Sequence, residues 1–280
     1  MRQIEAKEIT KLVAKLCIDA CYYMVPDIRK RMTQSKLTER SPLGQEILGT
    51  LLVNSDIARD RQKPLCQDTG MTVVFVNIGQ EVEIVGGFIG DAINQGVREG
   101  YQDGYLRKSV VKDPIIRENT KDNTPAVIHY NIVPGDKFEI HISPKGFGSE
   151  NKSQLKMLTP SQGEKGVKDY VVQVVSEAGA NPCPPIIVGV GIGGTMERCA
   201  FLAKKALLRP VGEDNPAPHL AAMEKELLER INKLGIGPAG FGGDTTALDV
   251  HIEAEATHIA GLPVAVNIGC HATRHASGEL

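Results

Sequence analysis

Residues 184–194, PPIIVGVGIGG, decide the fold that we expect for this chain. The apolar run predicts a short buried strand, and the glycines predict a tight turn at its end. Residues 195–208 then predict a helix that opens at this turn. A strand that leads through a short turn into a helix is typical of folds in which helices cover the faces of a sheet.

The segments around this unit add further strands. MTVVFVNIG (71–79) and PVAVNIG (263–269) predict buried strands. Residues 126–133 and 137–143 alternate apolar and polar positions and are joined by Pro-Gly-Asp, which predicts a hairpin. Because a hairpin and a strand–helix unit occur in one chain, we expect a mixed sheet.

Helices dominate the first 60 residues. Residues 4–24, 27–37 and 42–59 each predict one, and Ser41 before Pro42 is typical of a helix start. We therefore expect an α/β (mixed α+β) fold. It forms one domain over residues 1–280, in which a helical layer (1–60) packs with a mixed-sheet region and its flanking helices (61–280).

The composition argues against several classes of protein. The formal net charge is −2, which disfavours nucleic acid as the main partner. Aromatic residues make up 4% and Trp is absent, so base stacking is not expected. No apolar run approaches the roughly 18–20 residues that span a bilayer. The N-terminus lacks the apolar stretch and cleavage site of a signal peptide, so we expect a cytoplasmic protein.

The chain has six cysteines, and without an export signal free thiols in a reducing compartment are favoured over a disulfide framework. Cys17, Cys21 and Cys199 fall inside predicted helices. We expect these three to be small, buried hydrophobic residues.

The other three cysteines lie in turns or at strand ends, beside glycine or proline. They are Cys66 in KPLCQDTG, Cys183 in NPCPP and Cys270 in NIGCHAT. Three such thiolates can hold a 4Fe–4S cluster and leave one iron open as a Lewis acid. The spacing contains no C-x-x-C pair and by itself supports a shared cluster only weakly.

Polar residues beside these cysteines strengthen the case for chemistry. Gln67 and Asp68 follow Cys66 directly. Asp68 is a candidate general base, or else it forms an Asx turn with the residues that follow it. Arg107, in GYLRKSVV, is suited to binding a carboxylate.

Two histidines near the third cysteine have open interpretations. His258 is a candidate active-site residue, or else a buried histidine that is hydrogen-bonded within the core. His251 alternates with apolar positions on a predicted strand, and we expect it to face solvent.

Three glycine-rich segments are candidates for ligand loops. GVGIGGTMER (189–198) follows a strand and opens a helix, but it departs from the dinucleotide pattern G-x-G-x-x-G, so a nucleotide is not favoured. KGFGSENKS (145–153) and GFGGDTTA (240–247) are either linings for a small polar ligand or solvated surface loops.

These motifs together resemble a known family. PLCQDTG, KGFGSENKS, NPCPPIIVGVGIGGTMERC, GPAGFGGDTTALDVHIE and PVAVNIGCHATRHA are similar to the N-terminal, iron–sulfur half of class I fumarases. The same pattern occurs in the alpha subunits of two-subunit fumarases and of L-tartrate dehydratase. The resemblance covers nearly the whole chain, most strongly from Cys66 to His275.

The resemblance implies an oxygen-sensitive 4Fe–4S hydro-lyase whose cluster is bound by Cys66, Cys183 and Cys270. The single-chain members continue into a second domain that supplies further substrate-binding residues. The resemblance therefore implies that this chain is an alpha subunit. Its partner would be a separate beta subunit, in a symmetric assembly of two copies of each (α2β2).

The resemblance also implies roles for individual residues. The catalytic residues would be Asp68, as the base, and His258. The substrate-binding residues would be Gln67, Arg107 and the backbone of Gly148. Fumarate and L-malate are the favoured substrates, with L-tartrate as the alternative within the family. Two other hypotheses for the function are an iron–sulfur electron-transfer or sensing protein and a nucleotide-dependent oxidoreductase.

Overall fold

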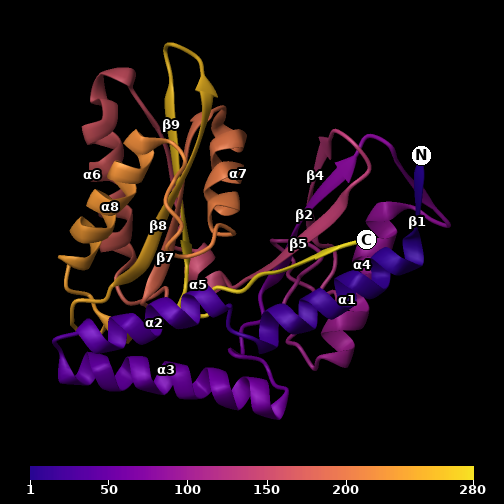
Figure 1. Cartoon of the computed structure of the whole chain (residues 1–280), viewed down its shortest axis with the longest axis horizontal. Coiled ribbons are helices and arrows are strands. Elements are labelled where there is room, and N and C mark those ends of the chain that lie inside the picture. Colours follow the sequence, from indigo (N-terminus) through magenta and orange to yellow (C-terminus); the bar gives the residue numbers. More distant parts are fainter. The chain divides into compact units, whose positions relative to one another are not determined.

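The computed structural model describes all 280 residues, which pack into two compact units. Unit 1 comprises residues 1–25, 54–147 and 274–280, and unit 2 comprises residues 26–53 and 148–273. Both units combine helices with β-sheet (Figure 1), so the α/β prediction is confirmed. Residues 1–60 are mostly helical, but their helices divide between the units.

Most of unit 1 is formed by residues 54–147. Its elements are β1 (Arg2–Glu5), α1 (Ala6–Tyr22), β2 (Met71–Gly79), β3 (Val82–Val85), α4 (Ile89–Asp103), β4 (Val127–Val133), β5 (Phe138–Lys145) and β10 (Ala276–Glu279). The main sheet has the order β10-β5-β2-β4, and β1 pairs with β3 in a separate two-stranded sheet. Helices α1 and α4 pack together over one face of the main sheet, where they bury its apolar side chains.

The predicted hairpin between residues 126–133 and 137–143 is wrong. Strand β2 lies between β4 and β5, parallel to β4 and antiparallel to β5. The Pro-Gly-Asp turn crosses the end of β2, where the Gly79 N–H donates to the carbonyl of Lys137. Strand β2 is buried along most of its length and β4 is mostly exposed. The more apolar strand therefore occupies the centre of the sheet.

Unit 2 is built around residues 184–194. Its elements are α2 (Pro26–Thr38), most of α3 (Pro42–Arg61), α5 (Phe147–Glu150), β6 (Gln154–Leu158), η1 (Pro160–Gln162), α6 (Gly163–Ala178), β7 (Ile186–Gly194), α7 (Met196–Ala206), α8 (Pro218–Asn232), η2 (Pro238–Gly240), β8 (Ala247–Thr257) and β9 (Leu262–Gly269). The sheet has the order β6-β9-β7-β8. Strand β7 is parallel to β8 and antiparallel to β9, so the sheet is mixed, as predicted.

Helices cover both faces of this sheet (Figure 1). Helices α6 and α8 bury one face, where their valines, leucines and isoleucines join those of β7, β8 and β9. Helix α7 covers the other face, with Cys199 and Ala203 against Ala265. The apolar run in residues 184–194 must be covered on both faces of the sheet, and the helices on the two sides provide this cover.

Two glycines of β7 allow α7 to lie close against the sheet. A Cβ atom at Gly191 would overlap the carbonyl oxygen of Cys199, and one at Gly189 would overlap that of Ala203. Both carbonyls belong to α7. These glycines of the GVGIGG run therefore serve the packing of a helix on a strand.

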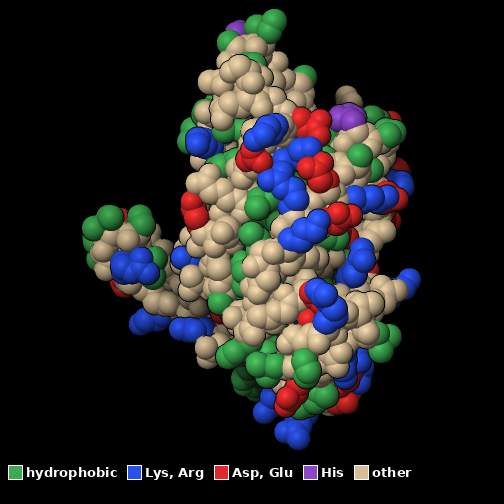
Figure 2. Space-filling view, turned by 90° about the vertical axis from the view of Figure 1, so that its left-hand side faces the viewer, with side chains coloured by type: hydrophobic (Ala, Val, Ile, Leu, Met, Phe, Trp, Pro, Cys, Tyr) green, Lys and Arg blue, Asp and Glu red, His purple; other side chains and the backbone are tan.

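Charged side chains are interspersed on the outer face that α6 and α8 form. Figure 2 shows lysine and arginine side chains among acidic ones on this face. Lys168 pairs with Glu226 of α8 at 2.7 Å, and Asp169 pairs with Lys165 at 2.6 Å and with Arg230 of α8 at 2.7 Å. Such exposed pairs contribute little to stability and keep both signs of charge mixed on this face. No helix in the chain combines the length and the apolar character of a membrane span.

We predict that Gly191→Ala lowers the free energy of unfolding by about 3 kcal/mol, because the added methyl group displaces the backbone of α7. Gly261→Ala is the matched control, since its Cβ would meet neighbouring atoms only at 3.8 Å or beyond. Urea denaturation of both variants checks the prediction. A loss at Gly191 that does not exceed the loss at Gly261 would contradict the packing argument.

Candidate functional site

The loop that carries Cys66 is held in unit 1 by buried side chains. The carbonyls of residues 68, 69 and 70 each accept a hydrogen bond from a different segment of the chain. The donors are Arg274 Nη2 at 2.7 Å, the Tyr101 hydroxyl at 2.7 Å and Asn123 Nδ2 at 3.2 Å. All three donors are at most 2% exposed. Because three consecutive peptide groups are fixed, the loop has one defined conformation.

Asp68, the candidate base, lies at the centre of this loop. Its Oδ1 accepts the N–H of Gly70 at 3.0 Å, and its Oδ2 accepts the N–H of Phe147 at 2.9 Å. The first bond is the Asx turn that the sequence allowed, and the second ties the carboxylate to the KGFGSENKS segment. A carboxylate oxygen has two lone pairs, so each oxygen can still accept a proton or a further hydrogen bond. The turn and the role of a base are therefore compatible.

Gly70 brings two motifs into direct contact. Its φ angle of +72° lies in the left-handed region, and its Cβ would lie 2.5 Å from the carbonyl carbon of Lys145. Next to Lys145, a Cβ on Gly146 would lie 3.2 Å from Asp68 Oδ2. The absence of side chains at both positions allows the Cys66 loop to pack on the end of β5.

The other predicted residues of this region lie beside the same loop. The Thr69 hydroxyl donates to the carbonyl of Arg107 at 3.0 Å, which places Arg107 next to the Asp68 segment. The side chains of Arg107 and Gln67 are exposed, and Asp68 is half-buried. Unit 1 thus places the Arg107 segment beside the loop of Gln67 and Asp68, and the side chains of these three residues are at least partly accessible to a solute.

Cys183 and Cys270 are brought together within unit 2. The N–H of His271 donates to the carbonyl of Cys183 at 3.2 Å, so the segment after β9 lies beside the segment before β7. Cys183 is exposed with a φ angle of +57°, and Cys270 is half-buried with its carbonyl accepting the N–H of Thr273 at 2.9 Å. A non-glycine residue in the left-handed region is uncommon and often marks a functional position.

The GFGGDTTA segment lies at the same end of the sheet. The N–H of Ala239, directly before this segment, donates to the carbonyl of Pro184, the residue after Cys183, at 2.7 Å. Buried Glu39 holds this segment by accepting the backbone N–H groups of Asp244, at 2.9 Å, and Thr245, at 2.8 Å. Burial opposes ionisation of Glu39, but these hydrogen bonds prevail and its pKa is lowered. Glu39 is therefore ionised, and its carboxylate holds the turn at residues 244–245 in place.

Gly148 also lies near Cys183. The atom closest to a Cβ at Gly148 would be the carbonyl oxygen of Asn181, at 3.9 Å, so the backbone there is open. Glu150 anchors the segment through Asn267 of β9, at 3.1 Å, and through Lys204 of α7. The polar loop is thus fixed by ion pairs and hydrogen bonds at one side and exposed at Gly148.

The structure contradicts the interpretation of His251 and removes one of the two alternatives for His258. His258 is exposed in the turn between β8 and β9, so the buried alternative is wrong. It lies before β9 and Cys270 lies after it, about 25 Å apart at ~3.3 Å per residue. Within unit 2, His258 and the two cysteines therefore lie at opposite ends of the sheet. His251 is buried, not solvent-facing, because β8 lies under α7, whose Ala206 carbonyl lies 3.1 Å from His251 Nδ1.

The thiols separate into the two groups that the sequence predicts. Cys17, Cys21 and Cys199 are buried, and burial raises the pKa of Cys21 and of Cys199 to about 11. They remain protonated and are poor metal ligands. Cys66, Cys183 and Cys270 are at least partly accessible and lie outside helices and strands. The chain contains no ready-made group of three or more metal-ligating side chains, but the donor chemistry of the accessible thiols fits an iron–sulfur cluster.

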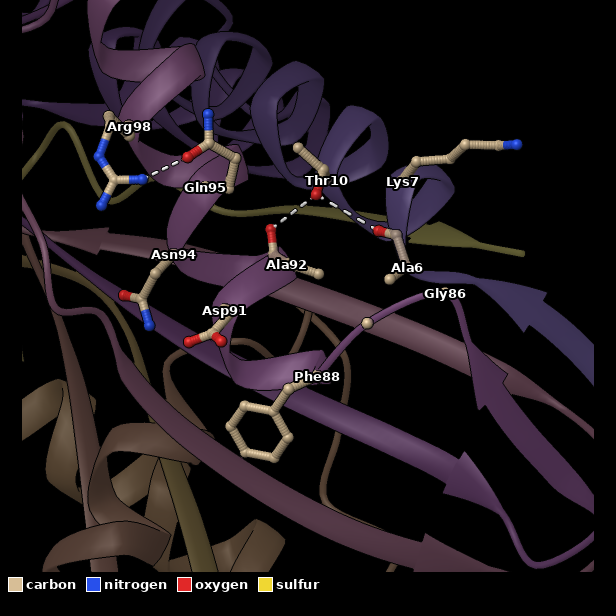
Figure 3. Close-up of a pocket in the computed structure, with 11 residues that line it drawn as sticks. Ala6, Lys7, Thr10, Gly86, Phe88, Asp91, Ala92, Asn94, Gln95 and Arg98 are labelled. Carbon is tan, nitrogen blue, oxygen red and sulfur yellow. Dashed lines mark hydrogen bonds between the residues drawn. The ribbon is translucent and has the colours of Figure 1, made fainter.

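A cleft of about 510 Å³ in unit 1 contains none of these residues. It lies between the start of α1, the segment 86–88 and the first part of α4 as far as Arg98 (Figure 3). The Thr10 hydroxyl bridges the two helices by donating to the carbonyls of Ala6 and Ala92, and Arg98 is bonded to Gln95. The cleft is lined by none of the residues that the sequence motifs single out, so it is not the candidate site.

Most of the side chains that hold the loops carry no signal in the sequence. Tyr101 and Asn123 carry no motif, since they lie on an amphipathic helix and in an irregular loop. Glu39 gave no signal beyond its place before a helix start. Arg274 lies in the quoted motif PVAVNIGCHATRHA, and a cationic residue that close to a cysteine was the one signal available.

The comparisons with known proteins identify the family of the chain. Residues 10–279 match the family described as fumarate hydratase (Fumerase). A Methanocaldococcus jannaschii protein named "Putative L(+)-tartrate dehydratase subunit alpha" is 43% identical over 96% of this chain and 96% of its own length. Proteins named L(+)-tartrate dehydratase subunit alpha from Escherichia coli strains UTI89 and K12 are 36% and 35% identical, over 98% of this chain and 91% of theirs. Because these matches span almost the whole sequence, the chain belongs to the fumarate hydratase (Fumerase) family of hydro-lyases.

Proposed function

We propose that the chain is the alpha subunit of an iron–sulfur hydro-lyase that interconverts fumarate and L-malate. The family supports the reaction type. The observation that carries the proposal is the fixed carboxylate of Asp68, which lies on the Cys66 loop and beside the Arg107 segment. A carboxylate on one segment and an arginine on the neighbouring one support this reaction, because the removal of water from a hydroxydicarboxylate requires a proton acceptor and a cation that binds a carboxylate.

In the proposed reaction each of the accessible groups has a role. In the dehydration direction Asp68 takes the proton from C3, the C–H electron pair forms the double bond, and the C2 hydroxyl leaves as water after protonation. Negative charge develops on the carboxylate next to C3. Arg107 would stabilise this charge, with Gln67 and the backbone N–H of Gly148 orienting the substrate.

The proposed cluster ligands are Cys66, Cys183 and Cys270. When bound, a 4Fe–4S cluster with one iron free of protein ligands supplies Lewis acidity toward the substrate hydroxyl and carboxylate. The residues of this chain contribute the thiolates and the loops that fix them, through Arg274 in unit 1 and His271 in unit 2. Accessible thiols that must stay reduced also support a cytoplasmic location.

We further propose a beta subunit as partner, in an α2β2 assembly. The names of the relatives as alpha subunits support a separate partner chain. The position of His258 supports more than one copy of this chain. It lies at the end of the sheet away from Cys183 and Cys270. If His258 takes part in catalysis, it would do so at the cluster of another alpha subunit.

L-Tartrate dehydration to oxaloacetate is the second candidate, because the relatives described above are named for L(+)-tartrate. Both substrates carry a hydroxyl and an acidic C–H between two carboxylates, so the same residues suit either. Steady-state rates of the iron-loaded complex with L-malate and with L-tartrate decide between them. Turnover of neither substrate by a complex with a full complement of iron would refute the proposal.

We predict that Cys183→Ser reduces the iron and sulfide bound per chain by more than half after anaerobic reconstitution, because one of three thiolates is lost. Cys199→Ser is the control, since Cys199 is buried in α7 and its Sγ only donates to the carbonyl of Met196. Iron and sulfide analysis with EPR spectroscopy measures both. Equal iron in the two variants would remove Cys183 from the ligand set.

We predict that Asp68→Asn retains the cluster but lowers kcat at least about 100-fold, because an amide cannot accept the C3 proton. Asp113→Asn is the control. Asp113 makes a similar turn in unit 1 by accepting the N–H groups of Ile115 and Ile116, at 2.8 and 2.7 Å. Its kcat is expected to stay within about twofold of the wild-type value. Full turnover by Asp68→Asn would exclude Asp68 as the base.

A further inference from the structure

We propose that Tyr101 is a positioning residue that fixes the Cys66–Gly70 loop and thereby orients the carboxylate of Asp68. The inference rests on the proposed role of Asp68. Its structural basis is the hydrogen bond of 2.7 Å from the Tyr101 hydroxyl to the carbonyl of Thr69, the residue between Asp68 and Gly70. The same hydroxyl lies 3.3 Å from the carbonyl of Gly70.

The surroundings of Tyr101 make its hydroxyl a permanent donor. The side chain is fully buried in the core between the sheet and the helices of unit 1. Burial raises the pKa of Tyr101 well above its ordinary value, so the hydroxyl stays protonated. Thr69 is 1% exposed, and a buried carbonyl that loses its donor is costly. Removal of the hydroxyl therefore favours a rearranged loop that exposes the Thr69 carbonyl.

A rearranged loop would act directly on Asp68. The carboxylate depends on two backbone N–H groups, those of Gly70 and Phe147, which lie on different segments. The peptide group that joins Thr69 to Gly70 carries the carbonyl that Tyr101 holds and also the N–H that Asp68 accepts. Movement of this peptide changes the Asx turn and the direction of the carboxylate. Because proton transfer needs a well-oriented acceptor, the rate falls even though Asp68 is still present.

The chain provides a matched control in Tyr22. This tyrosine is also buried in unit 1, and its hydroxyl donates to a backbone carbonyl, that of Gly104, at 2.9 Å. Gly104 follows the end of α4, not the Cys66 loop. Tyr22→Phe and Tyr101→Phe therefore remove the same group from similar surroundings, with similar expected effects on overall stability.

The test measures hydrogen–deuterium exchange of the Gly70 and Phe147 amides in the full chain. It also measures kcat, KM and bound iron in the reconstituted complex. We expect Tyr101→Phe to accelerate exchange of both amides about tenfold and to lower kcat about tenfold. Bound iron and KM should stay within about twofold of wild type, since the loss concerns orientation. Tyr22→Phe should leave exchange and kcat unchanged.

The outcomes separate this inference from the proposed function. Equal exchange at Gly70 and Phe147 in the two variants overturns the positioning role, whatever the activity. Faster exchange in Tyr101→Phe with unchanged kcat also overturns it, because the loop would then move without consequence for Asp68. If the wild-type complex turns over neither dicarboxylate, the proposed function fails, and with it the role of Tyr101 in catalysis, while the exchange data still show whether Tyr101 holds the loop.

Discussion

The hydrogen bonds of the Asp68 carboxylate to the backbone of Gly70 and Phe147 are the constraint on which the candidate site in unit 1 depends. They join the loop after Cys66 to the end of β5, and the close approach is possible because residues 70 and 146 are glycines. Arg274, Tyr101 and Asn123 then hold the carbonyls of the same loop. A rigid carboxylate is thus built from backbone bonds and from buried donors far away in the sequence.

Unit 2 also holds its polar loops in a defined conformation. The glycines of β7 allow α7 to lie against the sheet, and this sheet ends at Cys183 and Cys270. Glu39 secures the turn at residues 244–245 through backbone N–H groups, in the way that Asp68 secures its own turn. In both units a carboxylate organises a glycine-rich loop. This use of charge-assisted bonds explains how loops with so few apolar side chains keep a defined shape.

Much of the architecture could be predicted from local pattern. The buried strands, the amphipathic helices and the two groups of cysteines follow from hydrophobic periodicity and from the neighbours of each residue. The order of strands did not follow, because β2 lies between two segments whose turn and alternation are typical of a hairpin. The prediction that His251 faces solvent is wrong because it too depended on local pattern alone. Alternation along β8 shows that its two faces differ, but only the packing of α7 shows that both are covered.

The sequence by itself determined the fold class, the family, and the chemical types that the site offers, since these depend on residue identity and short-range order. Only the tertiary structure decided which groups hold Asp68, where His258 lies relative to Cys183 and Cys270, and why β7 needs its glycines. Tyr101, Asn123 and Arg274 lie 31 to 206 residues from the carbonyls that they bind. A hydrogen bond across such a separation exists only after the chain has folded, because no local pattern records which distant carbonyl a buried donor will meet.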